Sequence, residues 1–176
     1  MRTVVVYESL FGSTREIAEA IRDGIRDADP SAEIDLIRTG EGESTAVAQA
    51  DLLIVGGPTH MHGMSSGMSR KMGLSSEQKK AEAHPVEPGA EGPGIRDFLH
   101  QLPKVNSRRA AAFDTRGEGR MAGGAAHGIS RRLHSHGYEV TGAEGFIVEE
   151  MAGPLRTGER DRARAWAAGL MRQLVR

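Results

Sequence analysis

The sequence predicts an α/β fold with a doubly wound parallel sheet of five strands and helices on both faces. Two observations predict it. Short apolar runs of strand length alternate along the chain with segments whose apolar residues recur at helical spacing. The runs at residues 4–6 and 51–55 are almost continuously apolar, as is typical of strands buried on both faces of a parallel sheet. The first of these runs is expected to be the central strand.

The next elements follow from their periodicity. Apolar residues between positions 17 and 28 recur at helical spacing before a proline, so a helix is expected to cover one face of the sheet there. Residues 33–37 alternate polar and apolar, which indicates an edge strand with one wet face. A short helix is expected at 45–49. The strand at 51–55 should end at residues 56–58, Gly-Gly-Pro, because proline has no N–H for the ladder.

The segment at residues 63–93 is rich in Gly, Ser, Lys, Glu and Pro. It is too long for an ordinary connection in a compact domain. We therefore expect an insertion that acts as a lid, a mobile segment or both. The length of 176 residues suits a single domain, 1–176, with this insertion after the third strand.

The second half of the chain continues the alternation. A short helix is expected at 94–102 and a strand at 109–114, followed by a glycine-rich loop. A helix at 126–133, a last strand region within 138–148 and a C-terminal helix at 163–174 complete the pattern. The alternation of strands and helices is typical of a doubly wound sheet.

Composition narrows the classes of function. With 23 basic and 24 acidic residues the formal net charge is −1, so no strong field favours nucleic acid or an anionic membrane. The chain has no cysteine, which excludes disulfides, thiolate catalysis and cysteine-ligated metals, so redox chemistry requires a bound cofactor. No apolar run approaches the roughly 18 residues of a membrane span, and the N-terminus lacks the apolar stretch of a signal peptide. We expect a soluble cytoplasmic protein.

The loop after the first strand combines hydroxyl side chains with a glycine ahead of a helix. Such loops lie at the carboxyl edge of a doubly wound sheet, where ligands bind, and the helix N-terminus favours a phosphate. A loop that binds a nucleoside triphosphate would need a lysine that is missing here, so one terminal phosphomonoester fits better. Alternatively, Ser13 and Glu16 form a capping box and the loop binds no ligand.

Residues 9–14 resemble the phosphate-binding loop of the flavodoxin family, Ser/Thr-x-Thr-Gly-x-Thr, with Phe11 in place of the middle threonine. In this respect the loop resembles that of the related flavodoxin-like quinone reductases, in which an aromatic residue can occupy this position. Residues 56–64 look like the loop that borders the isoalloxazine ring in those reductases, and residues 114–119 look like the loop at its pyrimidine end. The resemblance covers nearly the whole chain except the insertion, and it implies a strand order of 2-1-3-4-5.

The resemblance implies flavin mononucleotide (FMN) as cofactor and three groups of binding residues. The first, the phosphate loop, comprises Ser9, Phe11, Gly12, Ser13 and Thr14. The second, the ring loop, comprises Pro58, Thr59, His60, Met61, His62 and Gly63. The third, the pyrimidine loop, comprises Asp114, Thr115, Arg116, Gly117 and Gly119. No catalytic side chain and no metal are expected.

The function that the resemblance implies is electron transfer through the flavin. The partner would be a redox protein or a small-molecule electron donor or acceptor, and the protein a monomer or homodimer. A first alternative on the same fold is an FMN-dependent NAD(P)H:quinone reductase or a protoporphyrinogen-oxidase-type enzyme. A second is a non-redox binding domain that has lost the flavin and uses the insertion for a protein partner.

Other motifs have competing interpretations. Residues 117–122 fit the dinucleotide pattern G-x-G-x-x-A, but they follow the fourth strand instead of the first and favour a flavin-edge loop. The two His-x-His pairs lie in a loop and at a helix end, which does not favour a metal site. Met64, Met68 and Met72 have the spacing of one helix face, which predicts packing against the domain or, alternatively, an adaptable lid over the site.

Overall fold

A computed structural model describes residues 1–119 and 124–174 of the chain. Across these residues, parallel strands lie in the order β2-β1-β3-β5-β6. A two-residue strand, β4 (Gly63–Met64), pairs antiparallel with β3. The predicted order 2-1-3-4-5 is confirmed, with β5 and β6 as the fourth and fifth predicted strands. The parallel strands are β1 (Arg2–Tyr7), β2 (Glu33–Arg38), β3 (Leu52–His60), β5 (Arg108–Arg116) and β6 (Tyr138–Ile147).

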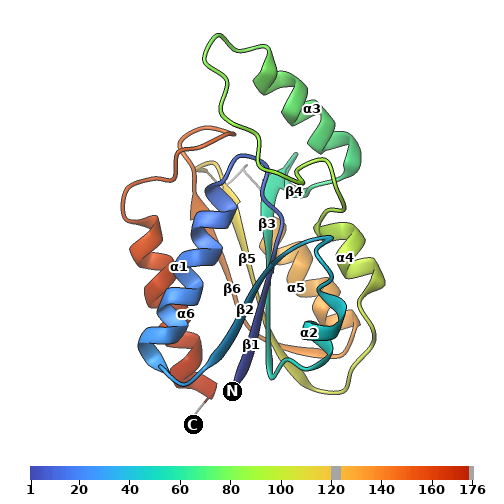
Figure 1. The fold of residues 1–176 in the computed structure, drawn as a ribbon, viewed down its shortest axis with the longest axis vertical. Coiled ribbons are helices and arrows are strands. Elements are labelled where there is room, and N and C mark those ends of the chain that lie inside the picture. Colours follow the sequence, from blue (N-terminus) through green and yellow to red (C-terminus); the bar gives the residue numbers. More distant parts are fainter. Residues whose placement is uncertain (120–123, 175–176) are drawn as a thin grey trace.

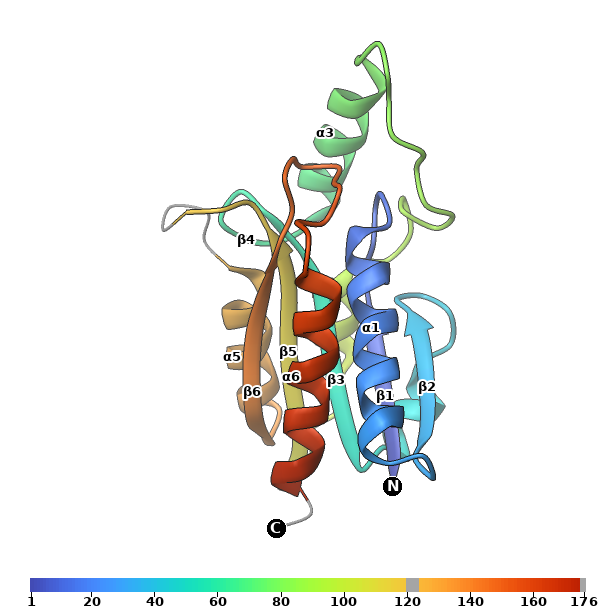
Figure 2. The same cartoon turned by 90° about the vertical axis from the view of Figure 1, so that its left-hand side faces the viewer.

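Helices cover both faces of the sheet (Figure 1 and Figure 2). One face carries α1 (Ser13–Ala28) and α6 (Glu159–Leu174). The two helices can approach closely because Gly24 has no side chain; a Cβ there would lie 2.1 Å from the carbonyl oxygen of Arg164. The third helix along the chain, α3 (Gly67–Gln78), projects beyond the carboxyl edge of the sheet. The other face carries α2 (Ser44–Ala48), α4 (Ile95–Gln101) and α5 (Ala125–Ser135).

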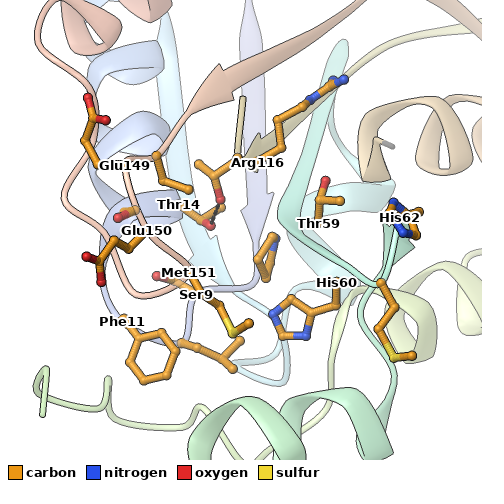
Figure 3. A pocket seen from close by; sticks show the side chains of 17 residues that line it. Ser9, Phe11, Thr14, Thr59, His60, His62, Arg116, Glu149, Glu150 and Met151 are labelled. Atoms are coloured by element: carbon orange, nitrogen blue, oxygen red, sulfur yellow. Dashed lines mark hydrogen bonds between the residues drawn. The ribbon is translucent and has the colours of Figure 1, made fainter. Parts of the chain in front are cut away.

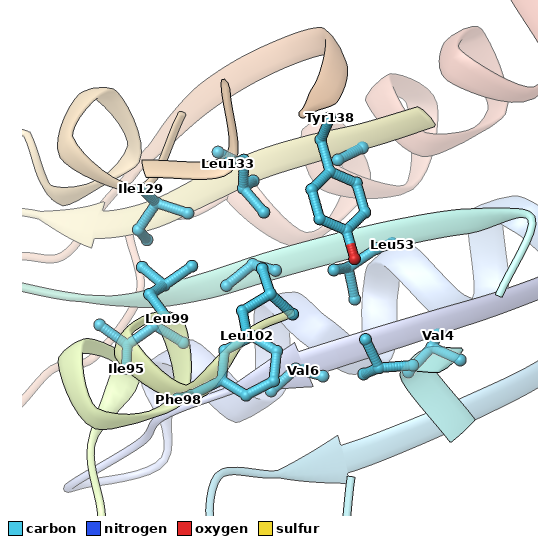
Figure 4. Packing of buried hydrophobic residues seen from close by; sticks show 14 of the residues in the cluster. Val4, Val6, Leu53, Ile95, Phe98, Leu99, Leu102, Ile129, Leu133 and Tyr138 are labelled. Atoms are coloured by element: carbon cyan, nitrogen blue, oxygen red, sulfur yellow. The ribbon is translucent and has the colours of Figure 1, made fainter. Parts of the chain in front are cut away.

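The valines of β1 explain why its sequence is apolar throughout. Val4 and Val6 belong to the core on the side of α4 and α5, and Val5 belongs to the core on the side of α1 and α6. None of the three has exposed surface. Figure 4 shows the first of these cores, in which Leu99 of α4 and Ile129 of α5 pack over the sheet. Burial on both faces is thus the physical cause of the apolar run.

β3 continues through the segment at which we expected it to end. The carbonyl of Gly56 accepts a hydrogen bond from the Glu8 amide, and the pairing with β1 ends at this point. The backbone nitrogen of Pro58, two residues further on, faces the same edge of β3 as the backbone of Gly56. The paired part of β1 has ended there, so the ladder needs no N–H from this proline. On the opposite side β3 still pairs with β5, Pro58 standing beside Thr115. The predicted end at 56–58 is therefore wrong, because proline is tolerated on this locally free edge.

The insertion at residues 63–93 contains β4 and α3. The N-terminus of α3 is closed by a capping box in which Ser66 and Ser69 each accept a hydrogen bond from the other's backbone N–H. After α3 the chain returns to α4 without a further helix or strand. On this return the amide of Glu87 donates to the carbonyl oxygen of Leu10 at 2.7 Å. The insertion therefore comes back across the loop that follows β1.

Met64, Met68 and Met72 do not share one environment. Met64 lies in β4 and packs against the core beside α5. Met68 and Met72 are 75% and 58% exposed, because α3 stands beyond the sheet. It is Leu74 of α3 that packs against the phosphate loop, beside Leu10. The predicted packing of the whole methionine stripe is therefore wrong for Met68 and Met72.

The C-terminal end of α3 predicts a pH dependence of stability. Glu77 accepts hydrogen bonds from the Lys80 ammonium at 2.8 Å and from the amide and ring Nδ1 of His84 at 3.0 and 2.7 Å. These donors lower the pKa of Glu77 to about 2. A carboxyl whose pKa is depressed by folding stabilises the protein above its unfolded pKa and loses this effect as the pH falls toward the folded value.

We therefore expect Glu77→Gln to lower the melting temperature at pH 6, and the difference from wild type to shrink as the pH falls from about 4.5 toward 2. Thermal unfolding followed by circular dichroism across this range measures it. Glu82→Gln, a change at an exposed position of the same segment, is the matched control. A difference between Glu77→Gln and wild type that is the same at pH 6 and pH 2.5 would contradict the assignment.

Candidate functional site

Four loops at the carboxyl edge of the sheet line a pocket of about 330 Å³ (Figure 3). They follow β1, β3, β5 and β6. The volume lies within the roughly 300 to 1,000 Å³ that is usual for small-molecule sites. The pocket sits beside the change of strand order between β1 and β3, where doubly wound sheets bind their ligands.

The phosphate loop leads into an uncapped helix. Gly12 is the N-cap of α1, with a φ of 103° that favours glycine, and the structure gives α1 no side-chain capping hydrogen bond. The amide of Glu16 donates to the carbonyl of Gly12. Ser13 is thus the first helical residue and not the N-cap, so the alternative that Ser13 and Glu16 form a capping box is wrong. The first-turn N–H groups of α1 are consequently available to an anion.

Three buried hydroxyls lie at the base of this loop. Ser9 Oγ accepts a hydrogen bond from the Gly12 amide at 3.1 Å, so the Ser9 hydroxyl proton remains available to an acceptor. The hydroxyls of Thr14 and Thr115 lie 2.8 Å apart, and one of the two donates to the other. The second proton of this pair can be donated to a ligand. All three side chains are less than 5% exposed and line the pocket.

The loop is also held by residues that do not line the pocket. Arg38, which is buried, donates to the carbonyl oxygen of Ser9 at 3.2 Å and to the Glu87 carboxylate at 2.5 Å. Glu87 in turn accepts from Arg15 in the first turn of α1, at 3.1 Å. Together with the amide bond from Glu87 to Leu10, these contacts tie the loop to β2 and to the insertion.

Phe11, the departure from the family pattern, packs against the insertion. Its side chain lies against a cluster formed by Leu10, Leu74 and Ala90. Leu74 comes from α3 and Ala90 from the chain that returns from it. An aromatic ring at this position therefore has a structural use that a threonine could not serve, because it covers apolar surface of the insertion.

The ring loop is a tight hairpin between β3 and β4. His60 pairs with Gly63, and the two residues between them, Met61 and His62, have φ values of 46° and 70°. Two central residues with positive φ are typical of a type I′ turn, in which Asn-Gly is preferred and bulky residues are strained. Met61 is 78% exposed despite its apolar side chain. The hairpin thus holds two large side chains at the pocket in an unfavourable backbone conformation.

Replacing Met61 and His62 by Asn and Gly is expected to stabilise the protein by about 1 kcal/mol, because the new pair suits the turn. We expect the same variant to weaken binding of a ligand in the pocket, which both original side chains line. Urea unfolding measures the first effect and ligand titration the second. A variant that is less stable than wild type would show that the side chains contribute more to folding than the turn strain costs.

His60 is held as a neutral side chain beside the pocket. Its Nδ1 lies 3.2 Å from the Ser69 hydroxyl of α3. Burial and the positive charge of Arg70 lower the pKa of His60, against the opposing effect of Ser69. The imidazole therefore offers the pocket a hydrogen-bonding group without a charge at neutral pH.

Asp114, which was predicted for the pyrimidine loop, lies within β5 and does not line the pocket; this strand continues past the predicted end at residue 114 to Arg116. Asp114 has no exposed surface and accepts hydrogen bonds from the Ala126 amide and from Arg116 Nε, both at 2.7 Å. Thr59 Oγ1 accepts a hydrogen bond from the amide of Ala125 at 3.0 Å. Both side chains thus satisfy the N-terminal amides of α5, whose N-cap is a glycine. Burial raises the pKa of Asp114, opposed by the Ala126 amide and the Arg116 guanidinium.

No protein-family model matches the chain, and the search of curated proteins found no match. Solved structures do match it. A flavodoxin from the domain Archaea aligns over 100% of both chains, with a TM-score of 0.67 and 16% identity. Flavodoxin 1 from Bacillus cereus aligns over 98% of both chains, with a TM-score of 0.63 and 19% identity. The Megasphaera elsdenii flavodoxin aligns over 95% of this chain and 98% of its own, with a TM-score of 0.60 and 22% identity.

The fold is flavodoxin-like. At these identities the likeness establishes the fold, as the resemblance predicted, and does not extend to the ligand.

Most of the predicted site residues meet at the pocket of this flavodoxin-like fold. The exceptions are Gly12, Gly63, Asp114 and Gly119, which are absent from its lining. Gly12 shapes the phosphate loop, Gly63 pairs in β4 and Asp114 is buried in β5. The G-x-G-x-x-A motif at residues 117–122 extends into positions 120–123, outside the described residues.

The loop after β6 lines the pocket but was not predicted from the sequence. It contributes Val148, Glu149, Glu150 and Met151. The topological rule that identified the other loops applies to the fifth parallel strand as well, so the position of this segment could have indicated it. Both carboxylates of this loop are at least half-exposed. Glu149 pairs with Arg156 at 3.4 Å, and Glu150 pairs with Lys80 at 3.7 Å. This pairing reduces their repulsion of an anion in the pocket.

Within residues 1–119 and 124–174, no group of three or more His, Asp or Glu side chains is placed to hold a metal ion. No helix in this part of the chain has the length and apolar character to cross a membrane.

Proposed function

We propose that this chain binds FMN in the pocket and transfers electrons through its flavin. The observation that carries the proposal is the phosphate loop, in which the uncapped N-terminus of α1 adjoins three buried hydroxyls. The matched flavodoxins of Bacillus cereus and Megasphaera elsdenii were solved in oxidised and two-electron-reduced forms respectively. We extend this redox role from the matched flavodoxins to the present chain because its pocket has the features of a phosphate-binding site.

The phosphate end of the ligand would rest on the phosphate loop. Amides of the first turn of α1, the Ser9 hydroxyl and one hydroxyl of the Thr14–Thr115 pair would supply neutral donors to a dianion, and the helix dipole would add to their effect. Among the residues that line the pocket, Arg116 carries the positive charge, and its Nε bonds Asp114. Neutral donors in this arrangement suit a single phosphate better than a triphosphate.

The ring end would lie between the ring loop and the loop after β6. Met61 and Met151 come from these two loops and are both largely exposed. Thioether groups contact aromatic rings favourably, so the two methionines can replace stacked aromatic side chains here. His60 stays neutral and can accept or donate one hydrogen bond at the ring edge.

Bound flavin would supply the redox chemistry, since its ring accepts and returns electrons. The protein's residues would hold the phosphate, orient the ring and exclude water from its buried side. A redox protein or a small-molecule donor and acceptor would complete the reaction as partners.

The test is a titration of flavin-stripped protein with FMN, followed by fluorescence quenching, with riboflavin as the phosphate-free control. We expect FMN to bind and riboflavin to bind at least tenfold more weakly, since a hydrogen bond to a charged group contributes about 1.5 to 3 kcal/mol. Reversible photoreduction and reoxidation of the FMN complex would then support the redox role. Failure of both ligands to bind would favour a non-redox binding domain instead.

A further inference from the structure

A second hollow, of about 220 Å³, opens beside the FMN pocket under α3. Its walls come from the ring-loop hairpin, from one side of α3 and from the loop after β6. Thr59, His60, Met61 and Met151 line both hollows. A molecule in the second hollow would therefore lie against the same side chains as a molecule in the first.

The lining of this hollow combines methionine side chains with neutral polar groups. Met61, Met72 and Met151 contribute three thioether side chains that are 78%, 58% and 68% exposed. None of the described residues that line it is Asp, Glu, Lys or Arg, whereas Arg116, Glu149 and Glu150 line the FMN pocket. Apolar side chains gathered at an exposed concave site mark a binding surface, and methionine adapts its shape to different occupants.

The polar side chains among the described residues that line this hollow carry no formal charge at neutral pH: Thr59, His60, Ser69 and Ser76. The imidazole of His60 is bonded to the Ser69 hydroxyl and kept uncharged by burial and by Arg70. Ser76 of α3 adds a hydroxyl to the lining. A wall that combines apolar side chains with a small number of placed polar groups is typical of a site for a small organic molecule.

Gly73 keeps the hollow open. It lies in the middle of α3, where glycine costs about 1 kcal/mol relative to alanine. A Cβ at this position would lie 3.8 Å from His60 Cε1 and 4.0 Å from Leu10 Cδ2 and Met151 Sδ, which is ordinary contact. Neither the backbone conformation nor a close neighbour therefore requires glycine here. The consequence of glycine at this position is the empty space in front of His60 and Met151.

We propose that this hollow is a subsite for an uncharged, mainly apolar aromatic molecule, next to the pocket in which the flavin would bind. The three methionines would contact its ring, and His60 or Ser76 would bond a single polar substituent. The inference rests on the proposed FMN site for the identity of the neighbouring group, while the binding of the aromatic molecule is a property of the hollow alone.

The experiment uses 2-naphthol as the probe and 2-naphthalenesulfonate as its charged counterpart, measured by equilibrium dialysis with and without FMN. Gly73→Leu fills the hollow from α3, and Ser76→Leu narrows it from an exposed position, which guards against a folding defect in the first variant. Gly169→Leu is the matched control, because a Cβ there meets only the end of the Arg172 side chain. Circular dichroism establishes that each variant is folded.

We expect wild type and Gly169→Leu to bind 2-naphthol saturably and the sulfonate at least tenfold more weakly. Gly73→Leu and Ser76→Leu should lose at least tenfold in 2-naphthol affinity and retain their FMN affinity. Equal binding of the probe by wild type and both hollow variants, or no saturable binding by wild type, would overturn the subsite. If FMN fails to bind while the 2-naphthol results hold, the proposed function fails and the subsite stands.

Discussion

Removing the hydroxyls of Ser9 and Thr14 together, by Ser9→Ala and Thr14→Val, is expected to weaken FMN binding by about 100-fold and to leave riboflavin binding unchanged. Ser9 retains a hydroxyl proton that can be donated to the phosphate, and the Thr14–Thr115 pair retains one that Thr14 donates when it accepts from Thr115. A hydrogen bond to a charged group contributes about 1.5 to 3 kcal/mol, and about 1.4 kcal/mol corresponds to a factor of ten. Riboflavin lacks the phosphate group, so it makes none of these hydrogen bonds and its affinity should not change.

The measurement is the same pair of fluorescence titrations on the double variant. Thr141→Val is the control, because its hydroxyl donates to the carbonyl of Ala110 in β5, away from the pocket. An equal loss of affinity for FMN and riboflavin would indicate general damage to the pocket. Unchanged FMN affinity would move the phosphate away from this loop and contradict the proposed orientation of the ligand.

Glu8→Ala is expected to lower the free energy of unfolding by about 3 kcal/mol, because it removes a buried carboxylate that accepts two strong hydrogen bonds. Glu8 is 3% exposed and accepts from the Ser65 hydroxyl at 2.5 Å and from the Ile95 amide at 2.7 Å. Ser65, which precedes α3, has no exposed surface, and Ile95 begins α4. Without the carboxylate, both donors would be buried and unpaired.

Urea unfolding of Glu8→Ala, Glu8→Gln and Glu82→Ala tests this assignment. Glu8→Gln keeps an acceptor oxygen and should lose less stability than Glu8→Ala, while Glu82→Ala, at an exposed position of the insertion, should change little. Because Glu8 adjoins the phosphate loop, Glu8→Ala should also weaken FMN binding. Equal stability of Glu8→Ala and wild type would mean that water replaces the carboxylate at no cost.

The sheet was predictable because its signals are local. The apolar run of β1 and the helical spacing in α1 each record burial at the position where they occur, so the alternation of strands and helices could be predicted from these segments. The order of the strands in the sheet came instead from the resemblance to flavodoxins. The end of β3 was not predictable in this way. Whether Pro58 breaks a ladder depends on where the neighbouring β1 stops, which is a fact about another segment.

The candidate site shows the same division. Position along the chain predicts which loops gather at the carboxyl edge, and Ser9, Thr14, His60 and Thr115 do line the pocket. The burial of Asp114 beneath α5 depends on where that helix begins, and no motif in the sequence records it. The FMN contacts assigned to these residues stay predictions until the titrations are made.

The contacts of Arg38 and Glu87 with the phosphate loop order this loop before any ligand binds. Arg38 and Glu87, which do not line the pocket, hold the backbone of Ser9 and Leu10, so folding itself sets the shape of this loop. Association then requires little further loss of backbone entropy, which is a source of affinity that no contact with the ligand reveals. Natural variation at residues 38 and 87 could accordingly tune cofactor retention among proteins that share the same pocket lining.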